Sequence, residues 1–145
     1  MKILMVTSEA VPFAKTGGLA DAVSALAIIL KKQGHDVRIV MPRYYKIDRS
    51  KLIKFDAPLA VAAGQVETWV GIYQSNLPDS DVPVYFIDHE QAYGRDGIYG
   101  TKTETDFHDN PYRSALLCHG AFQLCRLLGW YPDIMHAHDW FCGLV

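Results

Sequence analysis

The sequence predicts an α/β fold with a mostly parallel sheet, helices on both faces of the sheet and an inserted β-hairpin. Residues 2–7 and 36–41 are apolar at successive positions, as in parallel strands that helices cover on both sides. Between them, residues 17–33 carry apolar side chains with helical spacing. A strand, a helix and a second strand in this order form a βαβ unit, so the fold is predicted to be Rossmann-like.

The predicted helix at 17–33 has one core-facing stripe. Its apolar residues recur at steps of three and four positions, namely Leu19, Val23, Leu26, Ala27 and Leu30. Gly34 follows, and a glycine at this place predicts a left-handed end to the helix.

The middle of the chain departs from this alternation. Two β-rich runs, 52–62 and 66–77, flank Ala63-Gly64-Gln65 and predict a hairpin. A short parallel strand follows at 84–88. The next segment, 89–105, has no periodicity and is longer than a simple connection needs, so it is a candidate functional loop.

The last predicted elements are a helix at 106–128 and a strand at 133–138, with Asp139 directly after that strand. Polar residues near the start of this helix have helical spacing: Asp106, Asp109, Asn110 and Arg113. Such spacing favours a capping and salt-bridge cluster over a catalytic set.

The composition limits the class of protein. The chain has 145 residues, the size of one domain, and half of them are hydrophobic, which is typical of a globular α/β protein. The net charge of −2 gives no reason to expect a nucleic-acid or membrane partner. Residues 20–30 are too short to span a bilayer, and the start MKILMVTSEA lacks the pattern of a signal sequence. We therefore expect a cytoplasmic protein.

The cysteines and histidines do not predict a metal site or a nucleophile. Cys118, Cys125 and Cys142 form no C-x-x-C pair, so packed, reduced thiols are expected. His136 and His138 share one strand face while Asp139 points away from it, which argues against a shared metal ion.

The segment between the first strand and the first helix is a candidate phosphate site. The first N–H groups of a helix lack partners within it, and the helix dipole favours an anion there. Lys15 adds a positive charge and Thr16 can cap the helix. Gly17 and Gly18 allow unusual backbone angles and the close approach of a ligand. The spacing alone leaves a phosphate site and an ordinary turn open, and the G-x-G-x-x-G and P-loop patterns are absent.

These features are predicted to meet in space. In open α/β sheets, ligands bind outside the carboxyl ends of the strands. Lys15, the segment 89–105 and Asp139 are all expected at that end. We therefore expect them to face one cleft.

Three segments carry a family resemblance: 15–21 (KTGGLAD), 93–100 (YGRDGIYG) with 109–113 (DNPYR), and 136–144 (HAHDWFCGL). Together they resemble the glycogen and starch synthases that use ADP-glucose, which are built as two facing Rossmann domains in the GT-B arrangement. The resemblance implies that residues 1–145 are the amino-terminal domain of this catalytic type, ending before the domain is complete, with the carboxyl-terminal domain absent.

The resemblance also implies individual roles. Lys15 would bind the donor phosphate, and the remaining donor-site positions would be Gly17, Gly18 and Asp21. Asp139 is implied to be catalytic, near the transferred glucose. The other implied substrate-binding residues are Tyr93, on a loop that approaches the sugar, His138 and Trp140.

The implied activity is transfer of glucose from ADP-glucose to the non-reducing end of an α-1,4-glucan, with retention of anomeric configuration. No cofactor or metal is implied, because the lysine and the helix N-terminus would stabilise the departing diphosphate. A chain without the second domain is expected to be inactive alone. Two alternatives stay open: a binding or assembly module whose exposed sheet edge pairs with another copy, and a different nucleotide-sugar glycosyltransferase of the GT-B fold.

Overall fold

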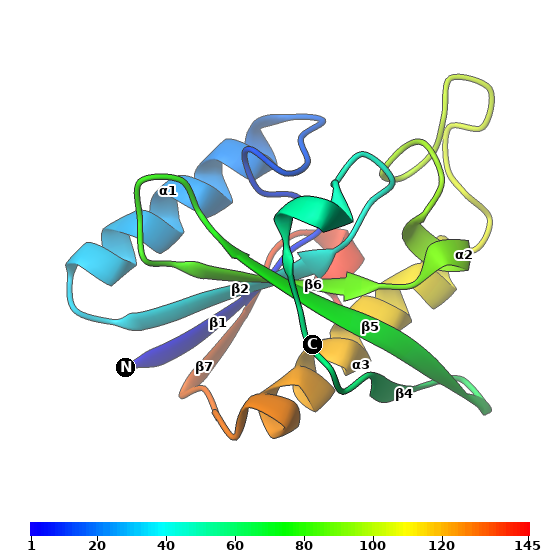
Figure 1. Cartoon of the computed structure of the whole chain (residues 1–145). Coiled ribbons are helices and arrows are strands. Elements are labelled where there is room, and N and C mark those ends of the chain that lie inside the picture. The colour runs from blue at the N-terminus through cyan, green and yellow to red at the C-terminus, as the bar shows by residue number, and fades with distance from the viewer.

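Seven strands form one open sheet in the computed structural model, which describes residues 1–145 (Figure 1). The strands lie in the order β3-β5-β6-β2-β1-β7, and β4 pairs with β5 beside this path. Their bounds are Lys2–Val6 for β1, Asp36–Pro42 for β2, Ile53–Lys54 for β3, Leu59–Ala63 for β4, Val66–Asn76 for β5, Pro83–Asp88 for β6 and Ile134–Ala137 for β7.

Four neighbouring strands have the predicted parallel arrangement. β6, β2, β1 and β7 are parallel neighbours, and one row across them joins Val84, Ile39, Met5 and His136. The first three of these side chains are fully buried. Burial on both faces explains why these strands are apolar at successive positions.

Helices cover both faces of the sheet, as predicted (Figure 1). They are α1, Gly18–Lys32, and α3, Asn110–Leu128. Neighbouring residues of β6 show the two sides. The ring of Phe86 lies 4.9 Å from that of Phe13, just before α1, whereas Ile87 faces Gly120 of α3.

The helix ends follow the turn residues. α1 matches its predicted range, and Gly34 after it has the left-handed φ of +88° that was expected. α3 begins at Asn110, later than the predicted start at 106, with Pro111 in its first turn. A proline is favoured there because its missing N–H would have no partner in the first turn.

The predicted hairpin is present, but its first arm is divided. β3 and β4 are separate strands, and both pair antiparallel with β5. Pro58 lies between them and cannot donate a ladder hydrogen bond, which explains the break. Gly64 makes the turn between β4 and β5 with a φ of +76°.

Three short helices shape the carboxyl edge of the sheet: η1 at Arg49–Lys51, α2 at Glu90–Tyr93 and η2 at Trp140–Cys142. The helix α2 was not predicted, because four residues are too few for a periodic pattern. His89 caps it, since its Nδ1 accepts from the N–H of Ala92 at 3.2 Å.

β7 forms one edge of the sheet, and Ile134 in it is 42% exposed. Pairing of two copies through this edge stays a prediction. The three cysteines are buried free thiols, as expected. Neither α1 nor α3 nor any shorter helix combines the length and apolar character needed to cross a bilayer.

Candidate functional site

A cleft of about 600 Å³ opens at the carboxyl edge of the parallel strands. Its main walls are residues 12–16 after β1, residues 44–46 after β2 and residues 95–101 after β6 and α2. Lys15 and the 89–105 segment therefore meet in one cleft, as the strand order predicts. Asp139 does not line this cleft.

Lys15 lies at the cleft wall beside the start of α1. Its Nζ forms an ion pair with Asp21 Oδ2 at 2.7 Å, and both side chains are about half exposed, at 51% and 55%. Exposed pairs of this kind are worth at most about 1 kcal/mol. An anionic ligand can therefore displace the carboxylate from the amine.

The N-terminus of α1 has no side-chain cap. Gly17 is the N-cap residue, and no side chain bonds to the first turn. Thr16, predicted as the cap, instead donates its hydroxyl to Glu9, so this prediction was wrong. Gly17 has an extended φ of −151° and Gly18 is helical, so neither uses the left-handed region. A Cβ on either would meet nothing within 4 Å, which leaves open space in front of the free N–H groups.

Glu9 was not among the predicted site residues, although it lies in the segment between β1 and Lys15. Its side chain is nearly fully buried, at 2% exposure. One carboxylate oxygen accepts from Thr16 N at 2.5 Å, and the other accepts from Thr16 Oγ1 at 2.7 Å. The turn that carries Lys15 is thus tied to the end of β1.

Tyr99 joins this turn to the opposite cleft wall. Its hydroxyl donates to Glu9 Oε1 at 2.8 Å, and its ring lies 5.6 Å from the Trp140 ring and 5.8 Å from the Phe141 ring. The region of Asp139 and Trp140 therefore adjoins the cleft through this one side chain.

Tyr93 and Arg113 support the cleft wall from the interior. Tyr93 is fully buried and its hydroxyl donates to the Arg113 carbonyl at 2.6 Å, so its side chain does not face the cleft. The Arg113 guanidinium donates to the carbonyls of Ala92 and Ile98 and to Asn110 Oδ1. Burial lowers the pKa of Arg113. The DNPYR motif thus holds the ends of the loop together. The predicted side-chain cap was wrong, because Asp109 is the N-cap residue of α3 but makes no capping hydrogen bond and pairs with Arg95 instead.

His138, Asp139 and Trp140 follow β7. Burial, with a smaller contribution from the charge of His136, lowers the pKa of His138 to about 4, so the ring is neutral at pH 7. Its Nε2 is buried without a hydrogen-bond partner. Asp139 has a φ of +66° and a ψ of 174°, and its Oδ1 accepts from Trp140 N at 2.8 Å. Trp140 is 54% exposed, which leaves part of its ring available to a ligand.

The histidines at the end of β7 face each other. The rings of His136 and His138 lie on the same strand face, as predicted, with centroids 4.1 Å apart. No group of three His, Cys, Asp or Glu side chains in the structure is arranged to hold a metal ion.

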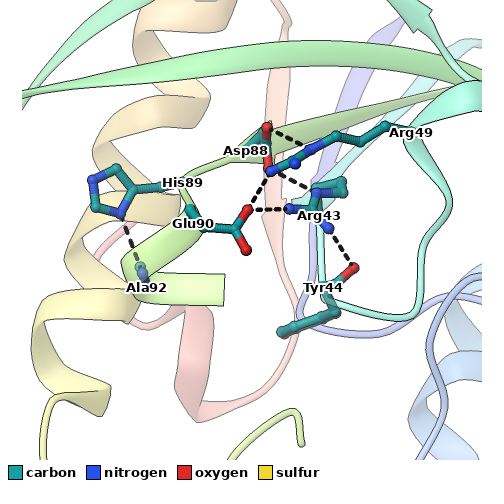
Figure 2. Close-up of polar contacts among 7 residues, drawn as sticks. All are labelled: Arg43, Tyr44, Arg49, Asp88, His89, Glu90 and Ala92. Atoms are coloured by element: carbon teal, nitrogen blue, oxygen red, sulfur yellow. Dashed lines mark hydrogen bonds and ion pairs between the residues drawn. The ribbon is translucent and has the colours of Figure 1, made fainter. Parts of the chain in front are cut away.

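A charged cluster anchors the cleft wall at residues 44–46, and Figure 2 shows this cluster between the end of β2 and the start of α2. Arg43, only 3% exposed, donates Nε to Asp88 Oδ1 at 2.7 Å and Nη2 to Glu90 Oε2 at 3.1 Å. Arg49 pairs with the same two carboxylates. The cluster fixes the segment 44–46 against α2, and no sequence pattern indicated it.

The cleft wall at residues 95–101, called the glycine-rich wall below, needs glycine at two positions of its backbone. Gly97 has a φ of +93°, and a Cβ on Gly100 would lie 2.1 Å from the Thr105 carbonyl oxygen. Lys46 and Asp96, on two different walls, form an exposed ion pair at 3.3 Å. The loop therefore folds back tightly on itself at the cleft.

An open sheet with four neighbouring parallel strands, and a lysine-bearing turn that leads from its first strand to an uncapped helix N-terminus in a cleft, define a Rossmann-like ligand-binding domain. The chain belongs to the starch synthase catalytic domain family, whose sequence model matches residues 2–145.

Related proteins agree. The glycogen synthase of Treponema denticola is 64% identical over 145 residues, which cover all of this chain and 30% of that protein. Glycogen synthase 1 of Geobacter metallireducens is 47% identical, again over the whole chain and 29% of that protein. The catalytic domain of starch synthase IV from Arabidopsis thaliana has a TM-score of 0.84 at 27% identity, over 99% of this chain and 29% of that one. The chain thus spans about 30% of its relatives' length, and its fold matches one half of the GT-B arrangement, as predicted.

Proposed function

We propose that this chain is the amino-terminal, donor-phosphate-binding part of a glycogen synthase. The whole enzyme would transfer glucose from ADP-glucose to the non-reducing end of an α-1,4-glucan, with retention. The observation that carries this proposal is the uncapped N-terminus of α1 beside Lys15 in the cleft. The similar starch synthase IV structure was solved bound to ADP and acarbose, which supports a nucleotide diphosphate donor.

The start of α1 supplies positive charge where the reaction needs it. As the bond from glucose to the diphosphate breaks, negative charge grows on the departing group. The free N–H groups after Gly17 and Gly18, the helix dipole and Lys15 all stabilise that charge. Because this charge is greater in the transition state than in the bound substrate, its stabilisation accelerates transfer. Asp21 holds the amine of Lys15 until the phosphate replaces it.

The sugar and the glucan acceptor lie on the side of Asp139. We assign Asp139 as the catalytic carboxylate beside the transferred glucose, and the half-exposed ring of Trp140 as a surface for the sugar. His138, neutral and with Nε2 unpaired, offers a hydrogen bond to a hydroxyl without adding charge. Tyr93 acts indirectly, because its buried hydroxyl holds the loop that carries Tyr99.

The phosphate assignment is tested by ADP affinity. In the full-length enzyme, Lys15→Ala should weaken ADP binding in calorimetry by on the order of tenfold or more, because a hydrogen bond to a charged group contributes about 1.5–3 kcal/mol. Lys32→Ala is the matched control, since Lys32 lies at the opposite end of the same helix. Equal ADP affinity for the two variants would refute the assignment.

Donor competition separates this function from another nucleotide-sugar transferase. We expect unlabelled ADP-glucose to suppress transfer from labelled ADP-glucose at far lower concentration than UDP-glucose does. The reverse order would favour the alternative enzyme. A full-length protein that binds neither donor would favour a non-catalytic assembly module.

A further inference from the structure

Glu9 is a buried carboxylate with no cationic partner. Its exposure is 2%, and the nearby Lys15 pairs with Asp21 instead. A buried charge is strongly destabilising unless hydrogen bonds satisfy it. Both oxygens of Glu9 accept hydrogen bonds, and all of their donors belong to Thr16 and Tyr99. Glu9 therefore fixes the positions of these two residues.

The two bonds to Thr16 fix the turn that carries Lys15. One oxygen accepts from the backbone N–H at 2.5 Å and the other from the hydroxyl at 2.7 Å, so the residue is held at two points. The N–H that Glu9 uses lies before the N-cap residue Gly17. The carboxylate thus orients the turn without occupying the N–H groups of the first helical turn.

The third bond reaches across 90 residues of sequence to the opposite wall. Burial and the bond to Glu9 raise the pKa of the Tyr99 phenol, so it keeps its proton. That single proton goes to Glu9 at 2.8 Å, and the hydroxyl of Ser8 therefore donates to Tyr99 at 2.6 Å. The ring of Tyr99 is held in one orientation by both bonds.

The same ring contacts Trp140 at 5.6 Å between centroids. A continuous chain of contacts therefore runs from Thr16 through Glu9 and Tyr99 to Trp140. One end lies beside the phosphate-binding lysine, and the other lies beside Asp139. Ser8 also bonds to Tyr99, but only Glu9 accepts hydrogen bonds both from Thr16 in the lysine-bearing turn and from Tyr99 in the glycine-rich wall.

We propose that Glu9 is a positioning residue that sets the Lys15 turn for the donor phosphate, and that Tyr99 couples this turn to the sugar side at Trp140. This inference rests on the proposed function, because it assumes that Lys15 binds phosphate. Glu9 itself touches no substrate. Loss of the Glu9 carboxylate should therefore affect donor binding and glucose transfer only through the positions of Lys15 and Tyr99.

The experiment is a double-mutant cycle in the full-length enzyme, with calorimetric binding of ADP and of adenosine. Glu9→Gln keeps the size of the side chain but presents an NH₂ group to one of its donors. We expect ADP affinity to fall on the order of tenfold, with adenosine affinity unchanged. In the Lys15→Ala background, the same substitution should change ADP affinity by less than about twofold. Glu67→Gln, on the exposed face of β5, is the matched control.

Tyr99→Phe provides a second test that removes one hydroxyl and keeps the ring. This substitution should lower kcat several-fold. In the double variant with Glu9→Gln, the fold-decrease in kcat should be smaller than the product of the two single decreases. Tyr131→Phe, at an exposed position, is its control. The inference is overturned if Glu9→Gln has the same ADP affinity as Glu67→Gln, or if Glu9→Gln weakens adenosine binding as much as ADP binding. It is also overturned if the losses of ADP affinity in Glu9→Gln and Lys15→Ala multiply in the double variant. Unchanged ADP affinity in Lys15→Ala alone would instead refute the proposed function, and the inference with it.

Discussion

Replacing Asp139 by glycine and by alanine measures the backbone strain at the turn after β7. Asp139 combines a φ of +66° with a ψ of 174°, a region that is essentially reserved for glycine. Both substitutions remove the same carboxylate and the same hydrogen bond to Trp140 N. Only the strain and the flexibility of the unfolded chain differ between them.

The expected difference follows from these two terms. A non-glycine residue in such a conformation costs about 1–3 kcal/mol in the folded state. Glycine costs about 0.4–1 kcal/mol more than alanine through the entropy of the unfolded chain. The glycine variant should therefore exceed the alanine variant in free energy of unfolding by about 1.3 kcal/mol, or about 3–5 °C in Tm for a chain of this size.

Urea titrations monitored by circular dichroism provide the free energies of unfolding of the two variants. The comparison is valid if both variants unfold with the same m-value. In the full-length protein, the proposed function predicts that both variants lose glucose transfer to the same extent, because both lack the carboxylate. If alanine proved as stable as glycine, the turn would carry no strain.

Two further predictions concern the glycine-rich wall and the end of β7. Gly100→Ala should lower the free energy of unfolding by about 1–3 kcal/mol, because the new Cβ would meet backbone oxygen at 2.1 Å. Gly18→Ala, which meets nothing within 4 Å, should leave it unchanged or higher in the same denaturation assay, and equal losses would contradict the clash. His138 has a folded pKa of about 4, below its ordinary 6.5, so the folded state binds fewer protons between these values and stability should fall as pH falls from 6.5 to 4. His138→Gln should lose less stability over this range, and identical pH curves for the two proteins would refute the assignment.

Local sequence patterns were sufficient to predict most of the helices and strands. The apolar strands and the stripe of α1 follow from burial, which acts on each segment in the same way wherever it lies in the chain. The divided arm of the hairpin and the start of α3 were placed less well. Pro58 and Pro111 decide both, one by interrupting strand pairing and the other by favouring a first helical turn.

The candidate site likewise contains some residues that could be predicted from the sequence and others that could not. Lys15, Gly17 and Gly18 are adjacent in sequence, so their meeting at a helix start could be predicted. Tyr93 shows the limit of this approach, since its motif indicated a loop residue but not that its side chain points inward. The cluster of Arg43, Asp88 and Glu90 brings together distant segments and has no signature in any one of them.

The sequence by itself determined the βαβ order, the helix N-terminus with its lysine and the edge of the sheet at which the cleft opens. Those features depend on the period of apolar residues and on neighbours along the chain. Only the tertiary structure decided that Glu9 would be buried and that Tyr99 would reach it from 90 residues away. A hydrogen bond depends on distance and angle in space, and the sequence specifies these only after the whole sheet has brought its loops together.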